Sequence, residues 1–586
     1  MSVIIHPSLI GILLGLLIFI FYHRILNYLA FFVSVLIFLF CLNLQEGVYS
    51  YLTIFNYEFY IKVDKLSLFF CYVFSLIGMV GLLYSLHEEN RLIAGPALLY
   101  MSSAIGVVLA YDLISFYAFW EILAFTAILL IISSRTKASY FSTVRYAIIH
   151  AVSGLCLLLG MLYLSTHYDI KSVASFSGIR GTFPYYLILL AVLINAAIPP
   201  LHFWLPDSYP NASIYGSVFL SAFTTKSAVY ALVRMFPGEP IISVAGALMA
   251  LYGVIYATLE NNPRRLLSYH IVSQVGFMVC GAGLGSQEAL NGASAHAFAH
   301  IIYKGLLFMS AGAVIYSTGL ERLHLLGGYA RRNPWVALYF FVGALSISGL
   351  PLTSGFVSKN ITIHSAADLH KPLEYLLMEV ASVGTFFSIV MKMGFNIFFG
   401  EPKSNYEVKP IPWNMHAAMF IASSLCILIG ILPSYYYQLL PYPEHFVPYT
   451  YTNVVNSLSL FSATALIYFL VAKLIAPKPK INLDTEWFFI KLCKALAYIF
   501  NKILVPAEYR YVGEFYRFLV DKMLVGVRNL LVSMNYVYLG KVATEVPQNV
   551  YNLSIKTSKF YDGNMMKYLQ FLLIFLAILL AVIILI

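Results

Sequence analysis

Apolar and polar positions alternate along this chain in long blocks. Apolar runs close to the ~20 residues that a bilayer requires recur from one end to the other, separated by short polar loops. They predict transmembrane helices at 9–22, 26–44, 66–86, 92–110, 113–133, 143–166, 184–205, 213–236, 241–259, 266–284, 290–318, 335–362, 374–399, 414–433, 455–476 and 568–586. The expected fold is an all-α polytopic membrane protein with about 16 transmembrane helices. Because the first run lacks a basic segment and a cleavage site, we expect it to be a retained span.

Composition supports a membrane protein and argues against other classes. Of the 586 residues, 60% are hydrophobic and 11% are charged, which excludes an ordinary soluble protein. The net charge of +10 fits basic cytoplasmic loops, so no nucleic-acid partner is expected. Six scattered cysteines form no Cys/His cluster, so neither a metal nor an iron–sulfur cofactor is expected. No hydrolytic or phosphate-binding motif suggests an enzyme.

Two predicted spans contain residues that interrupt helices. Residues 195–207 include Pro199, Pro200 and Pro206, and residues 349–360 include Pro351 between two glycines. Proline frees backbone carbonyls, and such breaks at membrane depth occur where they line a wet cavity, although a simple packing kink is the alternative.

The corresponding places of the two breaks suggest a repeated unit. We expect a first five-helix repeat at 92–236 and a second at 241–399. The other expected segments are N-terminal helices at 1–91, C-terminal helices at 400–476, an amphipathic lateral segment at 477–565 and a final helix at 566–586.

A stripe of ionisable residues lies in the apolar run 289–316. His296, His300 and Lys304 are spaced by four, so they share one face of a helix. Ionisable groups at bilayer depth are costly and usually mark an ion or proton route. A structural polar stripe and a set of metal or haem ligands are the alternatives.

Three further ionisable residues lie inside apolar spans. Glu121, Lys226 and Lys359 complete, with His300 and Lys304, an alternating acid–base set that suits charge transfer between neighbours. Lys392 is close enough to a span end to reach the surface, and we therefore give it an accessory role.

Several motifs in order resemble one known family. The residues 119–121, 200–207, 225–232, 268–276, 296–309 and 355–359 look like the antiporter-like membrane subunits of complex I, membrane-bound hydrogenases and Mrp-type cation/proton antiporters. The resemblance covers about residues 64–400. The motifs at 268–276 and 296–309 are most similar to those of the D-type Mrp subunits.

The resemblance implies two inverted five-helix repeats, each with a broken helix and a half-channel. It implies that Glu121, Lys226, His300, Lys304 and Lys359 carry protons and Na⁺ along a mid-membrane axis. Accessory positions are Asn195, His296, Lys392, His202 and Asp207.

One position departs from the pattern of the family. Asn195 stands where the family usually has a lysine paired with the glutamate. A neutral amide cannot form an ion pair with Glu121. The usual switch is therefore absent, or it is rebuilt with Lys226.

The sequence thus predicts a proton/cation-translocating subunit of a multi-subunit Na⁺/H⁺ antiporter complex. It would sit in a bacterial-type inner (cell) membrane among other membrane subunits. Loop arginines predict that the N-terminus lies outside. The alternatives are a proton-pumping subunit of a complex I-like or hydrogenase-like assembly with redox catalysis on its partners, a non-transporting scaffold, and a solitary permease.

Overall fold

A computed structural model shows a mainly helical protein. It describes residues 6–54, 57–401, 406–472, 477, 484–499, 502, 514, 521–522 and 525. The chain divides into two compact units, Met1–Glu486 and Trp487–Ile586. The periodic residues of the predicted amphipathic segment around 515–534 and the predicted last span at 568–586 lie almost entirely outside the described residues.

The apolar blocks form helices where the sequence predicts them. Those long enough to cross a bilayer are α3 (Lys65–Tyr84), α5 (Leu113–Ile131), α6 (Lys137–Tyr168), α9 (Ile214–Leu220) with α10 (Thr224–Met235), α11 (Pro240–Leu259), α12 (Pro263–Leu284), α13 (Gln287–Thr318), α16 (Pro372–Thr385) with η4 (Phe386–Phe399), α17 (Trp413–Ile431) and α19 (Tyr451–Val471). Shorter apolar helices are α1 (Pro7–Ile20), α2 (Leu26–Leu42), α4 (Ala94–Leu109), α7 (Phe183–Asn195) and α14 (Pro334–Ser348). The remaining elements are η1 (Ile132–Ser134), η2 (Ser177–Ile179), α8 (Trp204–Asn211), η3 (Tyr329–Arg331), α15 (Ser354–Asp368), α18 (Pro433–Gln438) and α20 (Thr485–Ile499).

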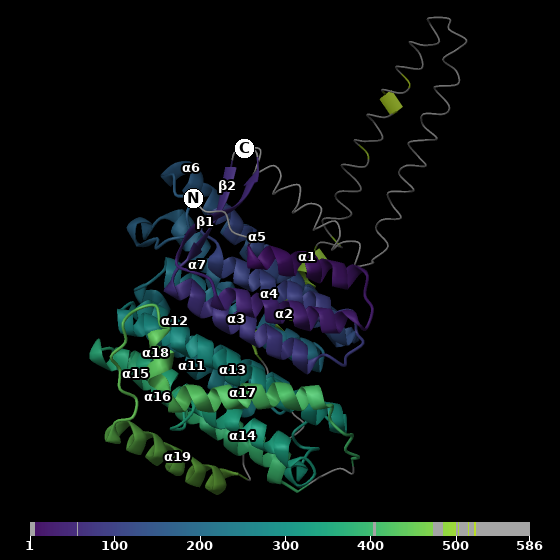
Figure 1. Ribbon diagram of the computed structural model, residues 1–586, viewed down its shortest axis with the longest axis vertical. Coiled ribbons are helices and arrows are strands. Elements are labelled where there is room, and N and C mark those ends of the chain that lie inside the picture. Colours follow the sequence, from purple (N-terminus) through teal and green to yellow (C-terminus); the bar gives the residue numbers. More distant parts are fainter. Residues whose placement is uncertain are drawn as a thin grey trace, which may run out of the picture. The chain divides into compact units, whose positions relative to one another are not determined.

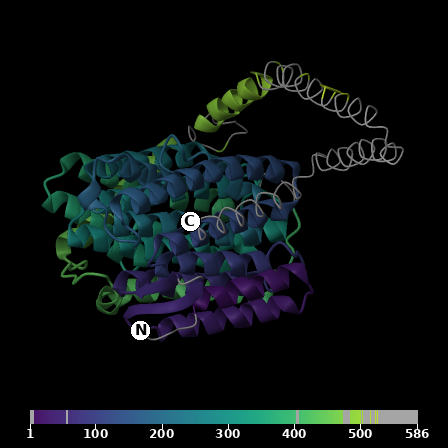
Figure 2. The same cartoon turned by 90° about the horizontal axis from the view of Figure 1, so that it is seen from above.

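The helices of the first unit pack side by side as a bundle. Figure 1 shows α1, α2 and α4 in purple and blue on one side of the bundle and α14 and α19 in teal and green on the other, while α17 packs against α3. The turned view places the purple N-terminal helices along one edge (Figure 2). Helix α13 lies at the centre, where it contacts α3, α9, α10, α12, α14, α15 and α17, and 94% of its apolar stretch is buried. By contrast, only 17% of the α19 stretch is buried, so α19 presents most of its apolar surface outward.

A β-hairpin precedes α3, an element that the division into apolar blocks misses. Strands β1 (Gly47–Ile54) and β2 (Tyr57–Val63) pair antiparallel with Gly47 opposite Val63. In β2 the apolar side chains of Phe59, Ile61 and Val63 are buried, while the residues between them face outward. This period of two is the ordinary signature of a half-buried strand.

Both predicted breaks are present. Helix α7 ends at Asn195, and the chain turns through Ala197, which has a φ of 61°, before α8 begins at Trp204. Helix α14 ends at Ser348, and Gly349 has a φ of 86° ahead of α15. A left-handed φ is easily adopted by glycine, which explains how the chain leaves the helix there.

A third interruption was not predicted. Helix α9 ends at Leu220 and α10 begins at Thr224, so the predicted span 213–236 consists of two short helices. No proline or glycine lies between them, so the sequence gives no signal for this break.

Candidate ion-translocation site

Glu121 lies on α5, facing α6. Helix α5 begins where the Asp112 carboxylate accepts a hydrogen bond from the backbone N–H of Ser115 at 2.7 Å. Two turns later the carboxylate of Glu121 packs against Gly154 of α6, where the absence of a side chain leaves it room. The Oε1 atom of Glu121 is buried and has no hydrogen-bond partner among the described protein atoms. A buried carboxylate oxygen in this state requires a water molecule or a proton.

Asn195 does not form a link to Glu121. Its Nδ2 donates to Ser153 Oγ of α6 at 2.5 Å and to the carbonyl of Ala191 at 3.0 Å. The amide thus ties the end of α7 to α6 and carries no charge. The role of the lysine that the family usually has at this position is therefore not taken over by Asn195.

Lys226 lies one turn after the unpredicted interruption. Its side chain is fully buried, and Nζ donates to the carbonyl of Ser221 at 2.6 Å. That carbonyl is available because the helix is interrupted between α9 and α10. The hydrogen bonds of the structure join Lys226 to the break and not to Glu121. They therefore give no support to a switch rebuilt as a pair of Lys226 with Glu121.

The three stripe residues share one helix, α13, but differ in their surroundings. The Nε2 atom of His296 lies 3.1 Å from Gln274 Oε1, and its Nδ1 lies 3.5 Å from Ser358 Oγ. Both ring nitrogens of His300 and the Nζ atom of Lys304 are buried without a partner among the described protein atoms. His296 is therefore held by neighbours, whereas His300 and Lys304 present unsatisfied polar atoms in the centre of the bundle.

Several nitrogen atoms that can take up a proton lie close to this point. Lys226 interacts electrostatically with both Lys304 and His300, and each interaction is repulsive when the groups are protonated. On α12, Nε2 of His270 lies 2.7 Å from Ser388 Oγ. The protonation of one of these groups therefore affects the protonation of the others.

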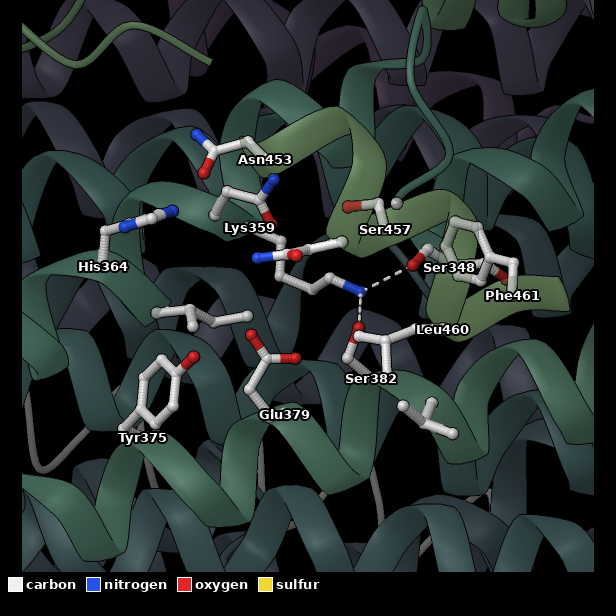
Figure 3. Close-up of a pocket in the computed structure, with 15 residues that line it drawn as sticks. Ser348, Lys359, His364, Tyr375, Glu379, Ser382, Asn453, Ser457, Leu460 and Phe461 are labelled. Atoms are coloured by element: carbon white, nitrogen blue, oxygen red, sulfur yellow. Dashed lines mark hydrogen bonds between the residues drawn. The ribbon is translucent and has the colours of Figure 1, made fainter. Parts of the chain in front are cut away.

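Lys359 lies just after the second break and lines a polar cavity. Its Nζ donates to the carbonyl of Ser348 at 2.8 Å and to Ser382 Oγ at 2.7 Å, as the dashed lines of Figure 3 show. The cavity has a volume of about 70 Å³, which is enough for several water molecules. Its wall includes Glu379 of α16, which interacts electrostatically with Lys359, and polar residues of the outer helix α19 such as Asn453.

The accessory residues have clear structural partners. Asp207 of α8 accepts two hydrogen bonds from Arg145 of α6, at 2.6 and 2.7 Å. Lys392 donates to the carbonyls of Thr258 and Glu260 at 2.7 and 2.6 Å, and so caps the C-terminal end of α11 rather than reaching the surface. His202, in the first break, lies 3.1 Å from Asp484.

Two acidic residues of the site are not among those that the sequence predicts. Glu379 is an acid within an apolar run, the same signal that identified Glu121, and could have been found in this way. Asp484 gives no comparable signal, because it lies among polar residues far along the chain from its partners. Among the described residues, no group of three His, Cys, Asp or Glu side chains could hold a metal ion.

A family model and a related protein together show the family to which this chain belongs. Residues 110–388 match the family model described as NADH:quinone oxidoreductase/Mrp antiporter, transmembrane. The D subunit of the Na⁺/H⁺ antiporter of Alkalihalophilus pseudofirmus is 31% identical over 360 residues, which cover 57% of this chain and 72% of that protein. The chain belongs to this family. It is accordingly a multi-pass membrane protein of the antiporter-like fold, as its sequence predicts.

Other relatives belong to different assemblies. Hydrogenase-4 component B of Escherichia coli is 26% identical over 421 residues, covering 64% of this chain and 62% of that protein. Among solved structures, a chain of the Mrp complex from a Dietzia species matches with a TM-score of 0.65 and 21% identity, over 79% of this chain and 97% of the other. A chain of an archaeal membrane-bound sulfane sulfur reductase matches with a TM-score of 0.68 and 22% identity, over 98% of each chain. These two likenesses show the fold.

Proposed function

We propose that this chain is the proton- and cation-translocating subunit of a multi-subunit Na⁺/H⁺ antiporter complex. Its partners would be other membrane subunits, and any redox catalysis in the assembly would belong to them. The residues that carry the ion path in this proposal are Glu121, Lys226, His300, Lys304 and Lys359.

The observation that carries the proposal is the set of buried ionisable atoms without protein partners. Oε1 of Glu121, both ring nitrogens of His300 and Nζ of Lys304 are all of this kind within the described residues. Buried polar atoms in proteins are almost always hydrogen-bonded, so these atoms require water. Acidic and basic groups that need water inside an apolar bundle are suited to proton transfer, and packing alone does not explain them.

The repulsion between neighbouring cations supplies a means of coupling. When a proton reaches Lys304, the ammonium disfavours a second charge on Lys226 and on His300. Arrival of a charge at one station therefore promotes release from the next. At the second break, the cavity around Lys359 offers a wet connection toward α19, and Glu379 offers a counter-charge there.

The test is the replacement of Lys304 by alanine in the complete complex. We expect cation/proton exchange in membrane vesicles to be abolished while the complex assembles normally, because the Lys304 ammonium forms no hydrogen bond with any residue that the structure describes. Lys171→Ala is the matched control, since this lysine is exposed and forms an ion pair with the exposed Asp169. Exchange at the wild-type rate in Lys304→Ala vesicles would contradict the proposed path.

The proposal also includes an orientation. Residues in loops and at helix ends such as Arg24, Arg135 and Arg265 would face the cytoplasm and the N-terminus would lie outside, in a bacterial-type cell membrane. Labelling of single introduced cysteines in intact cells with a membrane-impermeant reagent tests this orientation. A cysteine next to Arg135 should be protected, and a cysteine next to Lys171 should react.

A second candidate function is a proton-pumping subunit of a redox-driven complex. It is favoured by one observation, namely that the fold of the sulfane sulfur reductase chain matches 98% of this chain, whereas the fold of the Mrp complex chain matches 79%. Purification of the complex from its native membrane separates the two. Co-purifying iron–sulfur proteins would support the redox-driven assembly, and their absence from an exchange-active complex would support the antiporter.

A further inference from the structure

A residue from beyond α19 reaches back to the first break. Asp484 directly precedes α20, and its side chain is only 1% exposed. Although His202 stands 282 positions earlier, Asp484 Oδ2 lies 3.1 Å from its Nε2 atom. The fold thus joins the interrupted region between α7 and α8 to a segment that follows the last described membrane helix.

The pocket around Asp484 is built for an ionised carboxylate. Tyr269 of α12 donates its hydroxyl to Oδ2 at 2.6 Å, and Tyr252 of α11 donates its hydroxyl to Oδ1. The backbone N–H of Thr485 also donates to Oδ1, at 2.6 Å. With His202, four donors surround the two oxygens and fill the four acceptor positions of a carboxylate. An ionised carboxylate accepts from all four groups, whereas a protonated carboxyl group would require a tyrosine hydroxyl or the imidazole to change from donor to acceptor.

This arrangement fixes the proton of His202. Because Nε2 faces the carboxylate, it carries the hydrogen, and the neutral ring therefore has its lone pair on Nδ1. The Nδ1 atom is buried and has no partner among the described protein atoms. The ring of Tyr252 lies edge-on to the imidazole with centroids 4.8 Å apart and restrains its orientation. The one ring atom left open is a proton acceptor. On α12, Arg265 is a further charged group beside this cluster, through Tyr269.

We propose that His202 and Asp484 form a proton-holding dyad at the first break of the ion path. Nδ1 of His202 takes a proton from a water molecule or hydronium ion, so that one N–H bond forms as one O–H bond breaks, and release reverses the step. Asp484 is the positioning residue: it holds the imidazole in place and balances the charge of the imidazolium. The dyad rests on the proposed function and makes the segment after α19 a part of the path.

The test distinguishes the role of the hydrogen bond between His202 and Asp484 from the role of the Nδ1 atom of His202. In His202→Gln the amide nitrogen can replace Nε2 as donor to Asp484, but nothing replaces Nδ1. We expect the assembled complex to keep its thermal unfolding midpoint and to lose exchange by about 100-fold, the usual contribution of a proton-transfer group. Asp484→Asn places an amide donor among donors, so both the midpoint and the exchange should fall. Asp484→Glu restores a carboxylate and should recover exchange.

A double variant and two controls complete the experiment. If the residues act as a unit, His202→Gln/Asp484→Asn should exchange no more slowly than the slower single variant. Asp169→Asn, at an exposed ion pair, should leave exchange unchanged. Wild-type exchange in His202→Gln, or effects that multiply in the double variant, would overturn the dyad. Lys304→Ala assayed in parallel isolates the proposed function: if it exchanges normally, the path itself fails, whereas a loss there with normal exchange in His202→Gln refutes only the dyad.

Discussion

Replacement of Gly154 by alanine should displace the Glu121 carboxylate while leaving the bundle intact. A Cβ atom at position 154 would lie 2.1 Å from Oε1, 2.9 Å from Cδ and 3.2 Å from Oε2 of Glu121. Because ordinary contacts need about 3.5 Å, the carboxylate must move by more than about 1 Å. The atoms that clash form the end of a flexible side chain, so a rotamer change can relieve the contact without a shift of α5 or α6.

The magnitude follows from two opposing effects. An alanine in place of a helical glycine favours the helix by up to about 1 kcal/mol, and overpacking costs about 1–3 kcal/mol, so stability should change little. A misplacement of about 1 Å in a reacting group can cost about 100-fold in rate. We therefore expect Gly154→Ala to lose cation/proton exchange by up to that factor, measured in vesicles that contain the complete complex, while the unfolding midpoint stays within a few degrees of wild type.

The matched control lies on the same helix. At Gly160 of α6 a Cβ atom would meet Ile188 Cγ1 at 2.5 Å, a comparable clash with an apolar side chain. Gly160→Ala should therefore retain exchange. Equal losses in the two variants would indicate general damage to α6. Full exchange in Gly154→Ala, together with a loss in Glu121→Gln, would refute the position that the structure assigns to the carboxylate.

Three further predictions concern ion pairs and the second break. Arg145→Met leaves the buried Asp207 carboxylate without its guanidinium partner and should destabilise the fold by roughly 3 kcal/mol, seen in thermal unfolding and partly reversed by adding Asp207→Asn. Burial favours a raised pKa for the Asp64 carboxyl, but the hydrogen bonds and charge of Arg234 outweigh it and lower the pKa to about 2. A lowered pKa means that this pair stabilises the fold above about pH 4 and ceases to do so as the pH falls toward about 2. Asp64→Asn should therefore lower the free energy of unfolding at pH 7 by roughly 2 kcal/mol, seen as a lower unfolding midpoint, and have little effect near pH 2. Glu379→Gln removes the counter-charge of the cavity in Figure 3 and should slow exchange without preventing assembly; an unchanged rate would exclude Glu379 from the path.

The sequence predicts the helices well because each one is long and strongly apolar. Every span predicted before residue 477 coincides with a helix or a helix pair. Both breaks that contain proline are also present, because proline acts on the backbone locally whatever surrounds it. The β-hairpin at 47–63 was missed, since its alternation is short and lies between two much stronger apolar blocks.

Only part of the site can be predicted from the sequence, because some of its contacts join residues that are far apart along the chain. Spacing by four places His300 and Lys304 on one face of α13, which needs no tertiary information. The interruption that offers the Ser221 carbonyl to Lys226 contains neither proline nor glycine and depends on packing. The contact of Asp484 with the first break joins residues 282 positions apart, and a single sequence carries no trace of it.

The three breaks suggest different roles for the lysines of the path. At the first break the carbonyl of Ile194 accepts hydrogen bonds from the backbone N–H of Ala197 and from the indole of Trp204, both neutral donors. At the other two, carbonyls accept from Lys226 and Lys359, and a carbonyl favours an ammonium group over a neutral amine.

Among the described residues Lys304 has no such acceptor, because α13 is uninterrupted and its carbonyls serve the helix. The two lysines at breaks are thus suited to hold a proton, and Lys304 between them is suited to pass one on. A relay needs such a difference, because a charge held equally tightly at every station would not move. In the proposed path, the interrupted helices would therefore do more than line a wet cavity, since they would set where along the path the charge rests.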